Sequence, residues 1–235
     1  MNELAAVLQK LRTMGNPETV EKMGYFGISH AQALGIKIPI LKQFVKDMQL
    51  KNNHELALSL WEEPIHEAKL LAIFMDDPKQ VSLHQMEAWA GDFYSWDIVD
   101  SACTQLFVKT PYARQKLWEW VDREEEYIKR AGFVLMVGLA IHDKKAPNGE
   151  FEEFLPILER EAWDERNFVK KAVNWTLRQI GKRNLELNRY AIEAAERINR
   201  QGSKAARWIA SDALRELQSE KIQIRLLKRS GDDGR

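Results

Sequence analysis

The sequence predicts an all-helical protein, a solenoid of stacked two-helix repeats, and three observations indicate it. Strand signals are almost absent, whereas apolar residues recur at helical spacing along nearly the whole chain of 235 residues. Proline and glycine fall between the periodic segments. A pattern of one tryptophan followed by one charged residue also repeats. We therefore expect one domain over residues 1–229, followed by a short disordered tail at residues 230–235.

The expected helices are separated by residues that end or begin helices. These boundary residues are Pro39, Pro64, Pro78, Pro111, Pro147 and Gly202. Pro156 lies inside a periodic segment, but close to its start, where a helix tolerates proline. Helices of ordinary length, joined by short turns, follow from this spacing.

The repeat pairs a first helix that ends near a tryptophan with a second helix that carries a charged residue near its start. The tryptophans are Trp61, Trp89, Trp120 and Trp163, and the charged residues are Lys69, Asp100, Arg130, Lys171 and Arg207. Successive charged positions are 31, 30, 41 and 36 residues apart, which is the period of stacked two-helix units. We interpret the four tryptophans as core packing. In such a solenoid the second helices line a concave face.

Charge is distributed unevenly, although the formal net charge is zero. Residues 1–163 hold 18 basic and 25 acidic residues, and residues 164–235 hold 17 basic and 10 acidic residues. A basic C-terminal third can meet a polyanion on one surface. Cys103 is the only cysteine, which excludes an internal disulfide and a cysteine-cluster metal site. We find no secretory signal and no apolar stretch long enough to span a bilayer, so we expect a soluble cytoplasmic protein, nucleoid-associated in a bacterium.

Two second helices carry tryptophan on their polar side. At about 100° per residue, Trp175 shares a stripe with Lys171, Arg178 and Lys182, opposite Val169, Val173, Leu177 and Ile180. Trp96 shares a side with Asp100 and Thr104, opposite Ile98, Ala102 and Leu106. We expect Trp96 and Trp175 to be contact residues, whereas packing is favoured for Trp118 and Trp208.

Asp100 is the one acidic residue among the equivalent charged positions. The basic positions suit phosphate contacts, which a carboxylate would oppose. Two interpretations stay open: Asp100 is an ion-pair partner of Arg130, or it faces a cation that is not part of the protein. Arg130 lies on a helix that is apolar nearly all round, so we expect it to be partly buried and paired while it also reaches a phosphate.

Other chemistry is disfavoured by the sequence. The five histidines (His30, His54, His66, His84 and His142) show no ligand spacing, and no nucleotide-binding loop or nucleophile motif is present. We expect no metal and no cofactor.

Several strings resemble one family, the AlkD-type DNA alkylation repair glycosylases, which consist of HEAT-like repeats. They are FGI at 26–28, GIKIP at 35–39, SWDIVDS at 95–101, YIKRA at 127–131 and NFVKKAVNWTLR at 167–178. The resemblance covers about residues 20–220, and it implies an all-α solenoid of HEAT-like two-helix repeats with a concave, basic DNA-binding face.

The resemblance also implies roles for individual residues. Asp100, Trp96 and Trp175 stand where the family keeps its catalytic carboxylate and aromatic residues, and Phe26 where it places an aromatic residue near the lesion. The implied DNA-contacting positions are Arg130, Arg178 and Lys182, to which we add Lys171, Lys37, Lys42 and Arg207. Lys37 and Ile38 replace polar contact residues of the family, and Gly138 replaces a lysine. We therefore expect the contacts with DNA to differ in detail from those of the family.

The implied activity is that of a monofunctional, monomeric glycosylase, which excises N3-alkyladenine and N7-alkylguanine from duplex DNA. Two alternatives remain: a non-catalytic binder of damaged or branched DNA, and a repeat scaffold that binds proteins. A glycosylase is favoured over a non-catalytic DNA binder by the motif residues Trp96, Asp100 and Trp175. A DNA-binding protein is favoured over a protein-binding scaffold by the basic stripe at residues 171–182.

Overall fold

The computed structural model describes residues 3–28 and 31–232, and side chains as far as residue 230. Helices account for all of the regular structure in these residues, and no strand occurs among them. The predicted all-α class is therefore confirmed. The chain forms two compact units, residues 1–114 and 115–235. The prediction of one domain over residues 1–229 stays a prediction.

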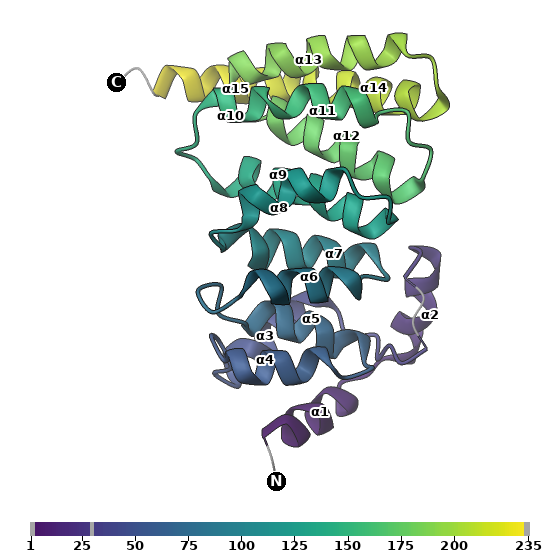
Figure 1. Ribbon diagram of the computed structural model, residues 1–235, viewed down its shortest axis with the longest axis vertical. Coiled ribbons are helices and arrows are strands. Elements are labelled where there is room, and N and C mark those ends of the chain that lie inside the picture. Colours follow the sequence, from purple (N-terminus) through teal and green to yellow (C-terminus); the bar gives the residue numbers. More distant parts are fainter. Residues whose placement is uncertain (1–2, 29–30, 233–235) are drawn as a thin grey trace. The chain divides into compact units, whose positions relative to one another are not determined.

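The first unit holds seven α-helices and two short irregular helices. They are α1 (Glu3–Thr13), α2 (Pro17–Tyr25), α3 (Ile38–Asp47), α4 (His54–Trp61), α5 (His66–Met75), α6 (Leu83–Gly91), α7 (Trp96–Ser101), the π-helix η1 (Ala102–Leu106) and the 3₁₀ helix η2 (Phe107–Lys109), among the described residues. Helix α5 packs against α3, α4, α7 and η1 (Figure 1). Helix α8 (Ala113–Val121) crosses the boundary between the units.

The second unit continues the series. Its helices are α9 (Glu126–His142), α10 (Asn148–Glu152), α11 (Phe154–Glu161), α12 (Asn167–Gly181), α13 (Leu185–Arg200), α14 (Lys204–Leu217) and α15 (Glu220–Asp232). Helix α12 packs against α9, α11, α13 and α14, and is thus central to this unit (Figure 1). Helix α15 continues to Asp232, so residues 230–232 are helical where the sequence predicted the tail to begin; residues 233–235 lie outside the described part.

The helices begin where the sequence provides N-caps. A side-chain oxygen accepts a hydrogen bond from the third N–H beyond it at Asn16, Asn53, Ser82, Asn184 and Ser203. Such caps satisfy donors that the first helical turn leaves unpaired. The predicted boundary residues fall between helices or in first turns, and Pro156 is the third residue of α11. The boundary prediction is confirmed.

Three of the four repeat tryptophans form core, as predicted. Trp61 and Trp89 stack in the first unit, with ring centroids 4.0 Å apart and planes 4° apart, and Trp120 is fully buried in the second. The prediction for Trp163 is wrong, since 60% of it is exposed. Helix α11 ends at Glu161, so Trp163 lies in the following turn, where the helix no longer directs it inward.

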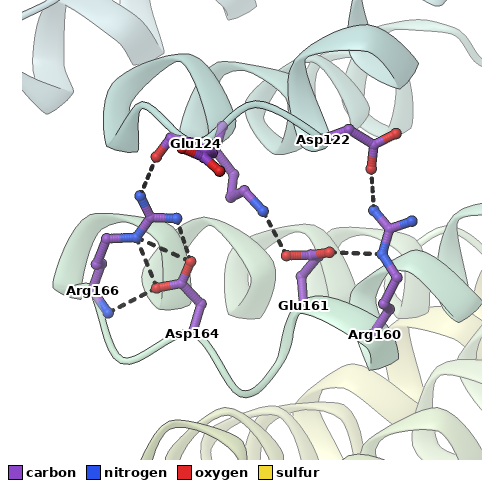
Figure 2. A network of polar contacts seen from close by, with 7 residues as sticks. Asp122, Glu124, Arg160, Glu161, Asp164 and Arg166 are labelled. Carbon is purple, nitrogen blue, oxygen red and sulfur yellow. Dashed lines mark hydrogen bonds and ion pairs between the residues drawn. The ribbon is translucent and has the colours of Figure 1, made fainter.

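Ion pairs fix the turn that leads into α12. Figure 2 shows Glu161 and Asp164 beside Arg160 and Arg166, with Asp122 and the backbone of Glu124 across from them. Both carboxylate oxygens of Asp164 accept hydrogen bonds from the Arg166 side chain, the shortest of which is 2.6 Å. Lys129 Nζ donates to Glu161 Oε2 at 2.7 Å. These bonds hold the start of α9 against the start of α12, the two helices that carry Arg130 and Trp175.

Among the residues described, no helix has the length and apolar character needed to cross a membrane.

Candidate functional site

The SWDIVDS segment presents two side chains of contrasting chemistry at the surface. Ser95, Asp97, Ile98 and Val99 are buried, whereas Trp96 and Asp100 are half-buried. The latter two are four residues apart, one turn of helix, and so lie on the same side of α7. The predicted facing of α7 agrees with this burial. Both residues are therefore partly exposed at the surface of the first unit.

A buried polar network fixes the start of α7. His66 Nε2 lies 2.9 Å from Asp97 Oδ2, His66 Nδ1 lies 2.9 Å from Tyr94 Oη, and Ser95 Oγ donates to Asp97 Oδ1. Burial alone would raise the pKa of Asp97, but hydrogen bonds from His66 and Ser95 outweigh it and hold the pKa below its usual value. Asp97 is therefore a charged structural anchor for the helix that carries Asp100.

The sequence pattern does not predict this anchor. His66 and Asp97 are separated by 31 residues, so no local spacing connects them. The available signal was the first acid of the SWDIVDS string, Asp97, which directly follows Trp96 and does not share the side of the helix that Trp96 and Asp100 occupy.

The backbone of Phe26 is bound to Trp96. Phe26 caps the C-terminal end of α2, and its side chain is 69% exposed. Trp96 Nε1 donates a hydrogen bond to Phe26 O at 2.8 Å. The structure therefore brings together two residues that the sequence placed in one site, and the bond orients the indole.

A π-helical turn begins at Ala102, two residues after Asp100. In η1 the regular hydrogen-bond ladder widens, and Thr104 Oγ1 donates to Asp100 O at 2.6 Å. Gln105 Nε2 donates to Thr104 Oγ1 at 3.3 Å, and Lys42 Nζ donates to Gln105 Oε1 at 2.9 Å. Such π-turns occur frequently at functional sites. Lys42, a predicted DNA contact, is thereby linked through two side chains to the backbone of Asp100.

The loop before α3 is held by hydrogen bonds to one buried carboxylate. Glu67 accepts the N–H groups of Leu34 and Gly35 at 2.7 Å each, and that of Ile36 at 3.2 Å. Gly35 has φ +76°, and a Cβ there would lie 2.3 Å from Asn16 O, so glycine is required. This geometry explains the GI turn of the GIKIP string. Lys37 follows it as an exposed side chain at the start of α3.

In the second unit, α12 has the two faces that the sequence predicted. Val169, Val173, Leu177 and Ile180 are fully buried. On the other side, Lys171 is exposed, and Trp175, Arg178 and Lys182 are half-buried. With the Gln179 amide oriented so that its oxygen accepts, Trp175 Nε1 donates to it at 3.0 Å. Trp175 is therefore held by its N–H while part of its ring stays accessible.

Two cations of this stripe are paired with acids of α14. Arg178 Nη1 lies 2.6 Å from Glu216 Oε2, and Lys182 Nζ lies 2.8 Å from Glu216 Oε1. Asp212 Oδ2 is 3.6 Å from Arg178 Nε. Burial by itself would raise the pKa of Glu216, but Lys182 and Arg178 lower it further than burial raises it. The stripe therefore needs a change of partners before these two cations can contact a phosphate.

The remaining predicted cations divide into one buried and two exposed residues. Arg130 is buried, and its Nη1 donates to Phe168 O at 2.6 Å, which agrees with the expected partial burial and pairing. Lys171 and Arg207 are exposed. Neither makes an ion pair with any residue that the structure describes.

No group of three or more His, Cys, Asp or Glu side chains within residues 3–28 and 31–230 is arranged to hold a metal ion.

Together these observations define a class: an all-helical repeat protein, with a surface aromatic–carboxylate pair on α7 and a cationic, tryptophan-bearing face on α12. Residues 7–217 match the family model described as DNA alkylation repair enzyme. This match covers most of the chain, and the protein belongs to that family. The resemblance recognised in the sequence is confirmed.

Two curated relatives and one solved structure are similar to the chain. Uncharacterized proteins of Listeria innocua and Listeria monocytogenes are 25% and 23% identical over 193 residues, which cover 81% of this chain and 84% of each relative. The solved structure is 20% identical with a TM-score of 0.74, and the match covers 92% of this chain and 95% of that one. It is described as a new family related to the HEAT-like repeat DNA glycosylases with affinity for branched DNA structures. This likeness confirms the HEAT-like repeat fold.

Proposed function

We propose that the protein binds duplex DNA and releases cationic alkylated purines by hydrolysis of the N-glycosidic bond. The observation that carries the proposal is the pair Trp96 and Asp100, one turn apart and half-buried on α7, in a chain of the DNA alkylation repair family. The lesions in question are N3-alkyladenine and N7-alkylguanine. No metal or cofactor takes part in the reaction as proposed.

The chemistry of these lesions suits a single carboxylate. Alkylation at N3 of adenine or N7 of guanine makes the base cationic, so the base departs as a neutral molecule without protonation by a general acid. Positive charge then develops on the deoxyribose, as in other oxocarbenium-like cleavages. Asp100 stabilises that charge and positions the attacking water. At about 5 Å and an effective dielectric near 20 the attraction is roughly 3 kcal/mol, about a hundredfold in rate.

The aromatic residues have a supporting role. Trp96, held by its bond to Phe26 O, and Trp175, held by Gln179, present ring faces to the cationic sugar. The exposed ring of Phe26 contacts the nucleotides beside the lesion. The assignment of Trp175 to the same reaction rests on the family resemblance of residues 167–178.

The phosphate backbone is proposed to contact the cationic side chains named from the sequence. They are Lys37, Lys42, Arg130, Lys171, Arg178, Lys182 and Arg207. Arg178 and Lys182 exchange Glu216 for phosphate on binding, so each of their contacts contributes less than that of an unpaired cation. We propose that the binding species is a monomer.

A second candidate is a non-catalytic binder of branched DNA. It is favoured by one observation, the fold shared with a solved protein whose description gives affinity for branched DNA structures. In that case Asp100 has no role in bond cleavage.

Base release from methylated duplex DNA decides between the two functions. We would compare the wild type with Asp100→Asn, and use Asp47→Asn, an exposed carboxylate on α3, as the matched control. The glycosylase proposal expects release by the wild type and by Asp47→Asn, and a loss of about a hundredfold or more in Asp100→Asn with DNA affinity retained. Undiminished release by Asp100→Asn would refute it. DNA binding by the wild type without release would favour the second function.

A further inference from the structure

The first unit contains a pocket rich in lysine, separate from Trp96 and Asp100. Its volume is about 630 Å³, and it lies where α3, α5 and η2 end. Five lysines line it: Lys42, Lys46, Lys51, Lys79 and Lys109. Phe74 contributes an apolar wall, with the Lys42 ammonium 5.0 Å from its ring centroid.

The two acids of the pocket, Asp76 and Asp77, are already engaged by other groups. Asp76 binds His54 Nδ1 at 2.7 Å and Gln85 Nε2 at 2.7 Å, and its side chain is fully buried. Asp77 accepts the N–H of Lys79 at 3.1 Å and the amide of Gln80 at 3.2 Å. Across the part of the chain that the structure describes, Lys42, Lys46, Lys51 and Lys109 form no ion pair.

Three of the lysines that line the pocket, Lys42, Lys51 and Lys109, affect one another through their charges. The pKa of Lys109 is lowered by burial and then by the charges of Lys51 and Lys42, and burial lowers the pKa of Lys42. Cations that are partly withdrawn from water without a counter-ion leave a local field that an anion relieves. A pocket of this size accommodates a nucleotide or a short stretch of one DNA strand. Either ligand is larger than a simple ion.

We propose that this lysine pocket binds a phosphate group carried by a nucleotide, either within a DNA strand or free in solution. Lysine ammonium groups are compact donors that suit phosphate oxygens from several directions, and Phe74 gives the sugar or base an apolar surface. Only the DNA form of this inference rests on the proposed function.

The pocket is connected to Asp100 within the same unit. Lys42, which faces the pocket, donates to Gln105, and the chain of hydrogen bonds continues through Thr104 to Asp100 O. A phosphate that draws the Lys42 ammonium toward itself therefore acts on the π-turn behind Asp100.

The DNA form is tested with an undamaged duplex, so the result does not depend on catalysis. We would compare the double variant Lys51→Glu/Lys109→Glu with a control of equal charge change, Lys22→Glu/Lys221→Glu, both exposed lysines outside the pocket. Fluorescence anisotropy over a salt series should show affinity reduced about tenfold or more in the pocket variant. The slope of log affinity against log salt should fall by about two relative to the control.

The free form is tested by calorimetric titration with inorganic phosphate and with adenosine monophosphate. Suppose that phosphate or adenosine monophosphate binds to the wild type and to the control but not to the pocket variant, and that the pocket variant binds DNA as tightly as the control does. This result assigns the pocket to free phosphate compounds. If neither DNA affinity nor titration distinguishes the pocket variant from the control, the inference is overturned.

Misfolding of the variant, loss of the proposed glycosylase activity and absence of phosphate binding in the pocket give different results. Circular dichroism melting checks the fold, and Lys51→Gln/Lys109→Gln serves if charge reversal prevents folding. Unaltered base release by Asp100→Asn would remove the proposed activity and leave the pocket measurements intact.

Discussion

Trp96 and Phe26 are joined by a hydrogen bond from the indole Nε1 to the backbone oxygen, 2.8 Å long, across 70 residues of sequence. The bond ties the C-terminal end of α2 to the first residue of α7. Because the N–H lies in the ring plane, the bond itself covers neither face of the indole. In the proposed reaction, the bond sets the angle at which the ring meets the sugar.

The first prediction separates the ring from its hydrogen bond. Trp96→Phe keeps an aromatic face and loses the N–H, whereas Trp96→Ala loses both. We expect base release from methylated DNA to fall about three- to tenfold in Trp96→Phe, the value of one net hydrogen bond, and more in Trp96→Ala because the cation–π contact is lost as well. Trp118→Phe, at a partly exposed tryptophan on α8, is the control. Equal rates in Trp96→Ala and the wild type would show that the indole has no part in the reaction.

The second prediction concerns the acid that neutralises the stripe on α12. Glu216→Gln removes the charge that pairs with Arg178 and Lys182, so both cations become available to phosphate. We expect DNA affinity at low salt to rise about threefold or more, with a steeper salt dependence. Anisotropy titration measures both quantities. Glu220→Gln, an exposed acid on α15, is the control, and weaker binding by Glu216→Gln would contradict the proposed role of the stripe.

The third prediction uses the pH dependence of the Asp97 anchor. The folded-state pKa of Asp97 is below its usual value, because hydrogen bonds from His66 and Ser95 outweigh burial. The contribution of this carboxylate is therefore complete above the unfolded pKa, about 3.9, and is lost as pH falls through the lower folded-state pKa. We expect Asp97→Asn to lower the free energy of unfolding by about 1–3 kcal/mol near neutral pH, and this deficit to shrink below about pH 4.

Denaturant titrations of both proteins at several pH values make the measurement. A deficit that stays constant from neutral to acidic pH would show that the carboxylate charge does not stabilise the fold. Asp97→Asn should also reduce base release more than its stability loss explains, since α7 carries Asp100.

The fourth prediction tests close packing in the second unit. A Cβ at Gly132 would lie 2.7 Å from Val121 N and 3.0 Å from the Trp120 carbonyl carbon. Since these are backbone atoms that cannot move aside, Gly132→Ala should destabilise the protein by about 1–3 kcal/mol. Gly149→Ala on α10 has nothing within 4 Å of its Cβ and serves as the control. Equal denaturant midpoints for the two variants would mean that α9 does not approach the end of α8 so closely.

Local sequence was sufficient for features that depend on the period of a helix. The burial of Val173 and Leu177 opposite Trp175, and of Ile98 opposite Trp96 and Asp100, follows from 3.6 residues per turn. Helix boundaries followed from prolines and capping residues, because these act on the backbone within one turn. The family followed from short strings whose residues are close in sequence.

Tertiary structure alone decided which charged side chains meet. Glu216 neutralises Arg178 from 38 residues away, and Lys42 bonds to Gln105 from 63 residues away. His66 pairs with Asp97 in the same manner, and Trp163 is exposed because its helix ends two residues earlier. The period of one helix fixes the direction of its side chains but contains no information on the register of the helix packed against it. Which side chains of different helices pair is therefore determined only when the helices pack. The same packing determines which cations remain without an ion pair.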